Sequence, residues 1–269
     1  MITIQNYVKV KTLEEAWELN QARSSRVLGG MMWLRLGAAN VKTAINLSAL
    51  GLNQVEESDG EFTIGALCTL RQLELHPGLR RYFGEAIAES VRHIVGVQFR
   101  NQATVGGSIF GRYGFSDVLT CLLALDTEVE LYRGGRVSLK EFAEAAWDRD
   151  ILTAIHIRKD GRRLKYQSVR QTKTDFPQIA CAVAVRKTED GEKWYLSVGA
   201  RPAKAALLEK EWEIAPETNP DTLTRLAAET AAEYRYGTNM RGSAEYRQHL
   251  AEVLIARALR ELSQTTDET

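Results

Sequence analysis

Two glycine pairs, Gly29-Gly30 and Gly106-Gly107, limit the fold of this chain more than any other feature of its 269 residues. The first pair follows the apolar residues Val27-Leu28 and precedes a helical pattern that begins at Met31. Glycine lets backbone N–H groups approach a bound oxygen closely, and the start of the following helix adds unpaired N–H groups and a positive dipole end. The first pair therefore predicts either a phosphate-binding loop or a tight turn, which needs glycine as often.

The second glycine pair has hydroxyl groups on both sides. Thr104 precedes it and Ser108 follows it, and both side chains can donate to phosphate or ribose oxygens. Ser116 is placed to cap the apolar helix expected over residues 118–125. Two such loops can clamp a diphosphate from two sides without a lysine or a metal ion. Neither has the spacing of a P-loop or of the three-glycine dinucleotide fingerprint, which argues against an ordinary Rossmann or NTPase fold.

The segment from Arg100 to Asp126 carries a long motif with fixed spacing. It reads Arg-Asn-x-Ala-Thr-Val-Gly-Gly, then Ser-Asp nine residues after the second glycine, then Leu-Leu-Ala-Leu-Asp. This motif resembles the FAD-binding subunits of molybdenum hydroxylases, such as the medium subunits of carbon monoxide and nicotinate dehydrogenases and the middle portion of xanthine dehydrogenase. The resemblance extends over nearly the whole chain, and Val27-Leu28-Gly29-Gly30 looks like the Ala-Gly-Gly-Thr-Asp loop of that family.

The resemblance implies an α+β fold. Its first part is a two-part FAD-binding domain of the vanillyl-alcohol oxidase (PCMH) type, and its second part is a small α+β C-terminal domain in which helices back a sheet. The expected boundaries are residues 1–160 for the FAD-binding domain, with subdomains 1–50 and 51–160, and residues 164–269 for the C-terminal domain. The residue pattern agrees, since an apolar strand is expected over 179–185 and helices over 221–236 and 243–262.

The resemblance also implies a set of FAD contacts. The two glycine loops would hold the pyrophosphate, Asp117 would face the nucleotide half, and Leu152 and Gln167 would lie near the flavin ring. Asp117 can also be read as only the first-turn acid of a helix. The full expected set is Val27, Leu28, Gly29, Gly30, Met31, Met32, Ile94, Ala103, Thr104, Gly106, Gly107, Ser108, Gly111, Asp117, Leu152 and Gln167.

Four of these positions depart from the family pattern. Met31 and Met32 stand where many relatives carry a hydroxyl and an acid, so only backbone donors remain there. Ser108 replaces the usual asparagine, which keeps a donor but shortens its reach. Ile94 stands where some relatives place an aromatic ring against the flavin, so stacking is not expected at that position.

Several functions are excluded by composition. Lys plus Arg and Asp plus Glu number 35 each, so no net charge draws the chain to nucleic acid. No apolar run is long enough to span a membrane, and we expect a cytoplasmic protein. The cysteines Cys68, Cys121 and Cys181 are too far apart for an iron–sulfur ligand set, and the four histidines lack metal-ligand spacing. We expect no metal site and no catalytic residue acting on an organic substrate.

The function implied by the resemblance is an electron relay. A partner with molybdopterin would hydroxylate the substrate, a small 2Fe-2S partner would carry single electrons, and FAD on this chain would pass them to an outside acceptor such as NAD. Two alternatives remain open. One is a stand-alone flavin oxidoreductase of the same fold, and the other is an assembly protein that has lost FAD, for which Met31-Met32 is the only hint.

Overall fold

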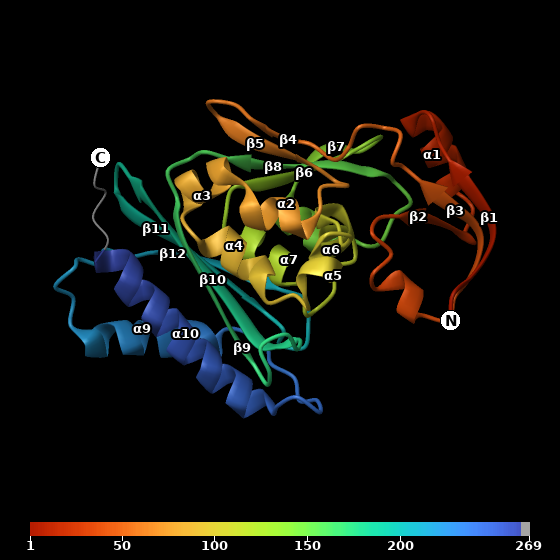
Figure 1. The fold of residues 1–269 in the computed structure, drawn as a ribbon. Helices are drawn as coiled ribbons and strands as arrows, with labels where there is room; N and C mark the ends of the chain where they lie inside the picture. The colour runs from red at the N-terminus through yellow and green to blue at the C-terminus, as the bar shows by residue number, and fades with distance from the viewer. Residues whose placement is uncertain (265–269) are drawn as a thin grey trace.

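A computed structural model describes residues 1–264 as an α+β molecule built in layers, which confirms the expected fold class (Figure 1). The first layer is a five-stranded antiparallel sheet in the order β4-β5-β8-β6-β7. Its strands are β4 (Val55–Glu57), β5 (Glu61–Gly65), β6 (Thr127–Leu131), β7 (Gly135–Ser138) and β8 (Leu152–Arg158). Short helices cover one face of this sheet.

Those helices form the middle layer and lie between two sheets (Figure 1). They are α2 (Leu70–Leu75), α3 (Pro77–Phe83), α4 (Ala86–Arg92), α5 (Val97–Arg100), α6 (Val105–Phe110) and α7 (Asp117–Leu123), and α8 (Leu139–Glu144) follows β7. Hydroxyl caps begin several of them: Thr104 accepts from Gly107 N at the start of α6, and Ser116 accepts from Leu119 N at the start of α7. The cap expected at Ser116 is confirmed.

The second sheet is antiparallel, in the order β12-β11-β10-β9, and carries two long helices on its far face (Figure 1). Its elements are β9 (Arg163–Arg170), β10 (Pro177–Thr188), β11 (Gly191–Gly199), β12 (Ala206–Glu211), α9 (Pro220–Ala232) and α10 (Ala244–Gln264). The expected strand over 179–185 and both expected helices are confirmed, with ends shifted by a few residues.

The apolar run in β10 is continuous because this strand is covered on both faces. Ile179, Cys181, Val183 and Val185 pack against α9 and α10, whereas Ala180, Ala182 and Ala184 point to the middle layer. Small side chains on that second face let α7 approach closely: a Cβ added at Gly199 of β11 would lie 2.1 Å from Thr120 Oγ1 of α7. Size alternation along β10 therefore sets the spacing between the layers.

The first fifty residues form a separate three-stranded parallel sheet in the order β1-β3-β2. Its elements are β1 (Thr3–Lys9), α1 (Leu13–Asn20), β2 (Ser25–Leu28), the 3₁₀ turn η1 (Leu34–Leu36) and β3 (Asn40–Asn46). One face of this small sheet packs on Ile151, just before β8. Within residues 1–264, no helix is long and apolar enough to cross a bilayer.

The prediction of a helix directly after Gly29-Gly30 is wrong. Met31 has φ of 59°, in the left-handed region, and only the three-residue turn η1 follows. Met31 packs on one face of the parallel sheet, and Met32 packs into the main core next to the middle layer. Both methionines therefore have a packing role that the local pattern did not reveal.

A buried ion pair holds α5 against α2, next to the glycine motif. Arg100 Nε donates to Glu74 Oε2 at 2.8 Å, and Arg71 pairs with the same carboxylate at 2.9 Å. Burial acts to raise the pKa of Glu74, but the hydrogen bonds from Arg71 and Arg100 outweigh it, and the pKa lies below its ordinary value. The ionised form of Glu74 thus stabilises the folded state.

Replacing this carboxylate should cost stability in a pH-dependent way. Glu74→Gln should lower the free energy of unfolding by about 3 kcal/mol at pH 7, because Arg100 loses its buried partner. Since the folded pKa is depressed, this contribution is present above the unfolded pKa of about 4.3 and is lost as pH falls through the folded value. Urea unfolding from pH 7 down to pH 3 measures it. The exposed Glu56→Gln is the control, and a constant difference between wild type and Glu74→Gln at every pH would contradict the ion pair.

Candidate functional site

The two glycine loops lie directly against each other. A Cβ added at Gly30 would lie 1.7 Å from the carbonyl oxygen of Gln102, and one added at Gly29 would lie 2.5 Å from Thr104 Oγ1. Real side chains never approach so closely, so contact between the loops alone requires glycine at both positions. The first loop leaves β2 of the parallel sheet, and the second begins α6 of the middle layer, so their contact joins the two parts of the molecule.

The backbone donors of the second loop are used within the protein. Val105 N donates to Cys68 O at 2.8 Å, Gly106 N donates to Ala66 O at 2.9 Å, and Gly107 N donates to Thr104 Oγ1 at 3.2 Å. The N-terminus of α6 is therefore hydrogen-bonded to the segment between β5 and α2. The hydroxyl proton of Thr104 remains available, because Thr104 Oγ1 accepts this bond and does not donate it.

The first loop has the opposite character. Within the described residues 1–264, none of the backbone N–H groups of Gly29 through Trp33 donates a hydrogen bond. These five consecutive groups follow a strand, and the positive φ of Met31 turns the chain between them. Successive unpaired N–H groups in a turn of this kind form a concave site for an anionic oxygen. Phosphate is the ligand that such a turn fits best.

Both loops border one cavity of about 500 Å³. Its volume falls within the range of cofactor sites. Most of the residues expected from the sequence line it: Val27, Leu28, Gly29, Gly30, Met31, Met32, Ala103, Thr104, Gly106, Gly107, Ser108, Gly111 and Leu152. Tertiary structure thus brings the two glycine motifs, 77 positions apart when counted from Gly29 to Gly106, to a single hollow.

A second cavity of about 210 Å³ adjoins the first and shares Trp33, Ser108 and Tyr113 with it. Ile94 and Asp117 line this smaller cavity. Rings from three parts of the chain form one wall, with centroids 5.4 Å apart for Trp33 and Phe115 and 4.4 Å apart for Phe115 and Phe176. This wall could not be predicted from the sequence, because isolated aromatic residues in loops show no periodicity.

Asp117 anchors the C-terminal sheet to the start of α7. Its Oδ1 accepts from Tyr166 Oη at 2.5 Å and from Arg170 Nη2 at 2.6 Å. Burial raises the pKa of Asp117, and the Arg170 guanidinium opposes that shift. The carboxyl group is thus both the first-turn acid of α7 and part of the lining of the small cavity.

Gln167 lies outside both cavities. Its side chain is half-buried on the side of α10, and its side-chain amide donates to Leu254 O at 3.3 Å. On the same strand, Tyr166 and Arg170 both bond Asp117 in the wall of the small cavity, and Arg170 also lines that cavity. Because successive residues of a strand point to opposite faces, a shift of one position moves a side chain from the site to the helix layer.

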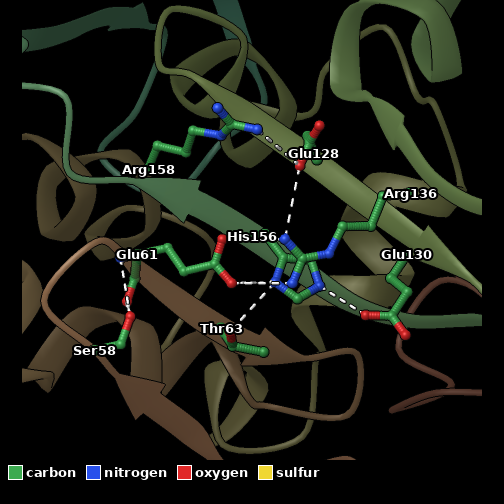
Figure 2. Close-up of polar contacts among 8 residues, drawn as sticks. All are labelled: Ser58, Glu61, Thr63, Glu128, Glu130, Arg136, His156 and Arg158. Atoms are coloured by element: carbon green, nitrogen blue, oxygen red, sulfur yellow. Dashed lines mark hydrogen bonds and ion pairs between the residues drawn. The ribbon is translucent and has the colours of Figure 1, made fainter.

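The other polar cluster of the molecule lies on the outer face of the five-stranded sheet (Figure 2). His156 of β8 is buried between the carboxylates of Glu61 at 3.3 Å and Glu130 at 2.8 Å, and Thr63 Oγ1 lies 3.2 Å from its Nδ1. Arg136 bonds Glu61 from the adjoining edge. Within residues 1–264, no group of three His, Cys, Asp or Glu side chains is placed to hold a metal ion. The cluster therefore joins the polar side chains of adjacent strands.

The cysteines show no reactive setting. All three are free and buried, and burial raises the pKa of Cys68 to about 11 and that of Cys121 and Cys181 to about 12. A thiol with so high a pKa stays protonated at neutral pH, so it is a poor nucleophile and a poor metal ligand. These side chains act as small apolar groups in the core.

Comparison with known proteins agrees with this geometry. Residues 2–158 match the family model described as "FAD binding domain in molybdopterin dehydrogenase", and residues 165–262 match the "CO dehydrogenase flavoprotein C-terminal domain". The Escherichia coli protein YgfM is 25% identical over 98% of this chain and 99% of its own length. The glyceraldehyde dehydrogenase medium chain of Sulfolobus acidocaldarius is 25% identical over 96% of this chain and 98% of its own.

A solved structure has the same fold. A chain of the carbon monoxide dehydrogenase from Oligotropha carboxidovorans superposes with a TM-score of 0.83, covering 98% of this chain and 99% of its own length at 20% identity. At that identity the likeness establishes the shared fold alone. Every layer described above thus has a counterpart in a known architecture.

The contact between the loops can be tested at Gly30. Gly30→Ala should lower the free energy of unfolding by about 1–3 kcal/mol or more, since its Cβ meets rigid backbone at Gln102. Gly60→Ala is the matched control, because a Cβ there meets nothing within 4 Å, and the change should stay within about 0.5 kcal/mol. Chemical unfolding of both variants gives the comparison. Equal stabilities for the two would contradict the close approach of the loops.

Proposed function

This chain belongs to the family of FAD-binding domains in molybdopterin dehydrogenases, and from that premise we propose that it is the electron-transferring flavoprotein subunit of a multi-subunit molybdenum hydroxylase. The single observation that carries the proposal is the run of free N–H groups from Gly29 to Trp33 along a cavity of about 500 Å³. These donors suit the pyrophosphate of FAD.

The residues present fit the cofactor. The first glycine loop would hold the pyrophosphate through main-chain donors, so the loss of a hydroxyl and an acid at Met31 and Met32 leaves the main contacts in place. Thr104 would add a hydroxyl donor from the facing loop. Ser108 lines both cavities, although its hydroxyl donates to Thr104 O at 3.1 Å. The N–H groups of Gly106 and Gly107 already have partners. These two glycines would contribute by letting the backbone approach the pyrophosphate closely.

The flavin end of the site would be the smaller cavity. Ile94 and the rings of Trp33, Phe115 and Phe176 supply an apolar wall there, while Asp117 supplies a charged group held by Arg170. Leu152 lies in the larger cavity, so it would contact a part of FAD nearer the pyrophosphate. Gln167 lies outside both hollows, and we leave it out of the proposed set of contacts.

FAD, when bound, supplies exchange of one or two electrons. The protein's own contribution is to bind it, to orient it and to keep water from the flavin end. We propose that the electrons come from a small 2Fe-2S subunit and originally from a large molybdopterin subunit, and that they leave to an acceptor such as NAD. The described part of the chain has no ligand set for a cluster or a metal of its own, so these centres belong to partners in this proposal. The name "medium chain" of the glyceraldehyde dehydrogenase relative supports a complex of that kind. We place this complex in the cytoplasm.

The purified chain should carry FAD. Its absorption spectrum should show flavin bands near one equivalent, and the released cofactor should be FAD and not FMN. Thr104→Val should weaken FAD binding by roughly tenfold or more, because a donor to a charged oxygen is lost, while Thr104→Ser should retain it. Titration of the apoprotein with FAD measures both. No flavin uptake by folded wild-type protein at high added FAD would refute the proposal and favour an assembly protein without the cofactor.

Purification from the native organism should separate the relay from a stand-alone oxidoreductase. An affinity tag on this chain should recover two further subunits, one containing molybdenum and one containing iron and labile sulfide. Metal analysis and electron paramagnetic resonance of the complex test this, with the untagged strain as control. Recovery of the chain alone, with FAD and with its own substrate-oxidising activity, would overturn the partner assignment and leave the cofactor assignment intact.

A further inference from the structure

An exposed tryptophan stands at the rim of the larger cavity. Trp147 lies in the segment between α8 and β8 and lines the hollow although 63% of its surface is exposed. An aromatic ring at the mouth of a cavity is the kind of apolar surface that a bound ligand covers. The sequence placed Trp147 only near a short amphipathic helix and gave it no role.

The position of the Trp147 ring is fixed from one side. The Phe110 ring meets it at an interplanar angle of 87° with centroids 5.6 Å apart, and the Arg112 guanidinium lies over it at 5.6 Å. Arg112 is itself buried, lies 3.9 Å from the centroid of the Phe142 ring, and donates from Nε to Phe142 O at 2.8 Å. A tryptophan held in this way keeps a free surface toward the cavity.

Arg112 also brings a buried positive charge to this end of the site. Its Nη1 and Nη2 atoms are buried and have no hydrogen-bond partner in the described structure. Aromatic rings surround the guanidinium, and the Asp148 carboxylate is near enough to act on its charge. A cation behind Trp147 would attract a ligand that carries a diphosphate, and it would also polarise the indole ring.

The backbone around Trp147 is tied to the N-terminal unit. Arg149 Nη1 donates to Asn20 O at 2.9 Å and to Ala22 O at 2.8 Å, and Asn20 Nδ2 donates back to Arg149 O at 2.8 Å. Trp147 therefore belongs to a segment that is bonded to the end of α1 and lies at the rim of the larger cavity. The larger cavity borders the small cavity at Trp33, Ser108 and Tyr113.

The two ends of the combined site differ in a way that assigns the two ends of FAD. The small cavity has a wall of three aromatic rings and a buried charged pair, Asp117 and Arg170, which suits the flat redox-active ring. The Trp147 end offers one exposed ring at the rim of the larger cavity. This end suits adenine, because adenine takes no part in electron transfer and serves only for binding.

From this arrangement we propose that Trp147 is the platform on which the adenine ring of FAD stacks, positioned by Phe110 and Arg112. The inference rests on the proposed function, since it assumes that FAD occupies the larger cavity. A nucleobase stacked on an exposed indole covers apolar surface on both partners, and it tolerates an open rim because only one face of the base has to be covered.

Substitutions at Trp147, combined with the two halves of the cofactor, test the proposal. Trp147→Ala apoprotein should bind FAD and ADP roughly 5- to 150-fold more weakly than wild type, the range found when a stacking aromatic is truncated, and should bind FMN unchanged. The affinity of Trp147→Phe for FAD should stay close to that of wild type. Trp147→Leu should bind as weakly as the alanine variant, because leucine fills part of the volume but has no ring on which a base can stack. Tyr7→Ala is the control, since Tyr7 is 60% exposed and lies outside both cavities.

Isothermal titration with FAD, ADP and FMN gives the dissociation constants, and thermal unfolding shows that each variant is folded. An unchanged FAD affinity in Trp147→Ala would overturn the inference and leave the proposed function standing, with Trp147 then a contact for another protein surface. A loss of FMN affinity equal to the loss for FAD would also overturn it, because the flavin ring would then be the stacked group. Absence of FAD binding by wild type would instead refute the proposed function.

Discussion

The contact between Gly30 and the backbone of Gln102 is the constraint on which the rest of the site depends. It joins the first fifty residues, which contain the parallel sheet, to the helical middle layer. No residue with a Cβ fits at that point. The N–H groups of the second loop donate to the carbonyl oxygens of Cys68 and Ala66, so the free backbone donors are those of the first loop. The same contact thus builds the joint between two parts of the chain and leaves one side of it able to bind an anion.

The layers around this joint explain why the site lies where it does. Alanines on one face of β10 and Gly199 on β11 let α7 pack closely on the C-terminal sheet, and Asp117 at the start of α7 binds Tyr166 and Arg170 of β9. The start of α7 and the start of α6 are therefore both fixed next to the hollow. A site placed where three packed parts meet can present rings and donors from each, which a single element cannot do.

Part of this could be predicted from the chain. The apolar strand over 179–185, the cap at Ser116, and the expectation that the two glycine motifs belong to one site follow from local patterns and from the resemblance of Arg100–Asp126 to a known family. The helix expected after Gly30 is absent, because the left-handed backbone of Met31 follows from packing on the parallel sheet. The aromatic wall of Trp33, Phe115 and Phe176 and the rim residue Trp147 had no local signal, since isolated rings in loops acquire a shared position only by folding.

Most strands and helices, and the family of the chain, could be inferred from the sequence alone, because periodicity, capping and motif spacing are local properties. Which N–H groups stay free depends on the tertiary fold. Gly29–Trp33 and Thr104–Gly107 look alike as glycine-rich turns before a helix, yet only the second finds carbonyl partners, at Cys68 and Ala66. That difference depends on residues far away in the chain, and a hydrogen-bond donor is available to a ligand only when no distant acceptor has reached it first.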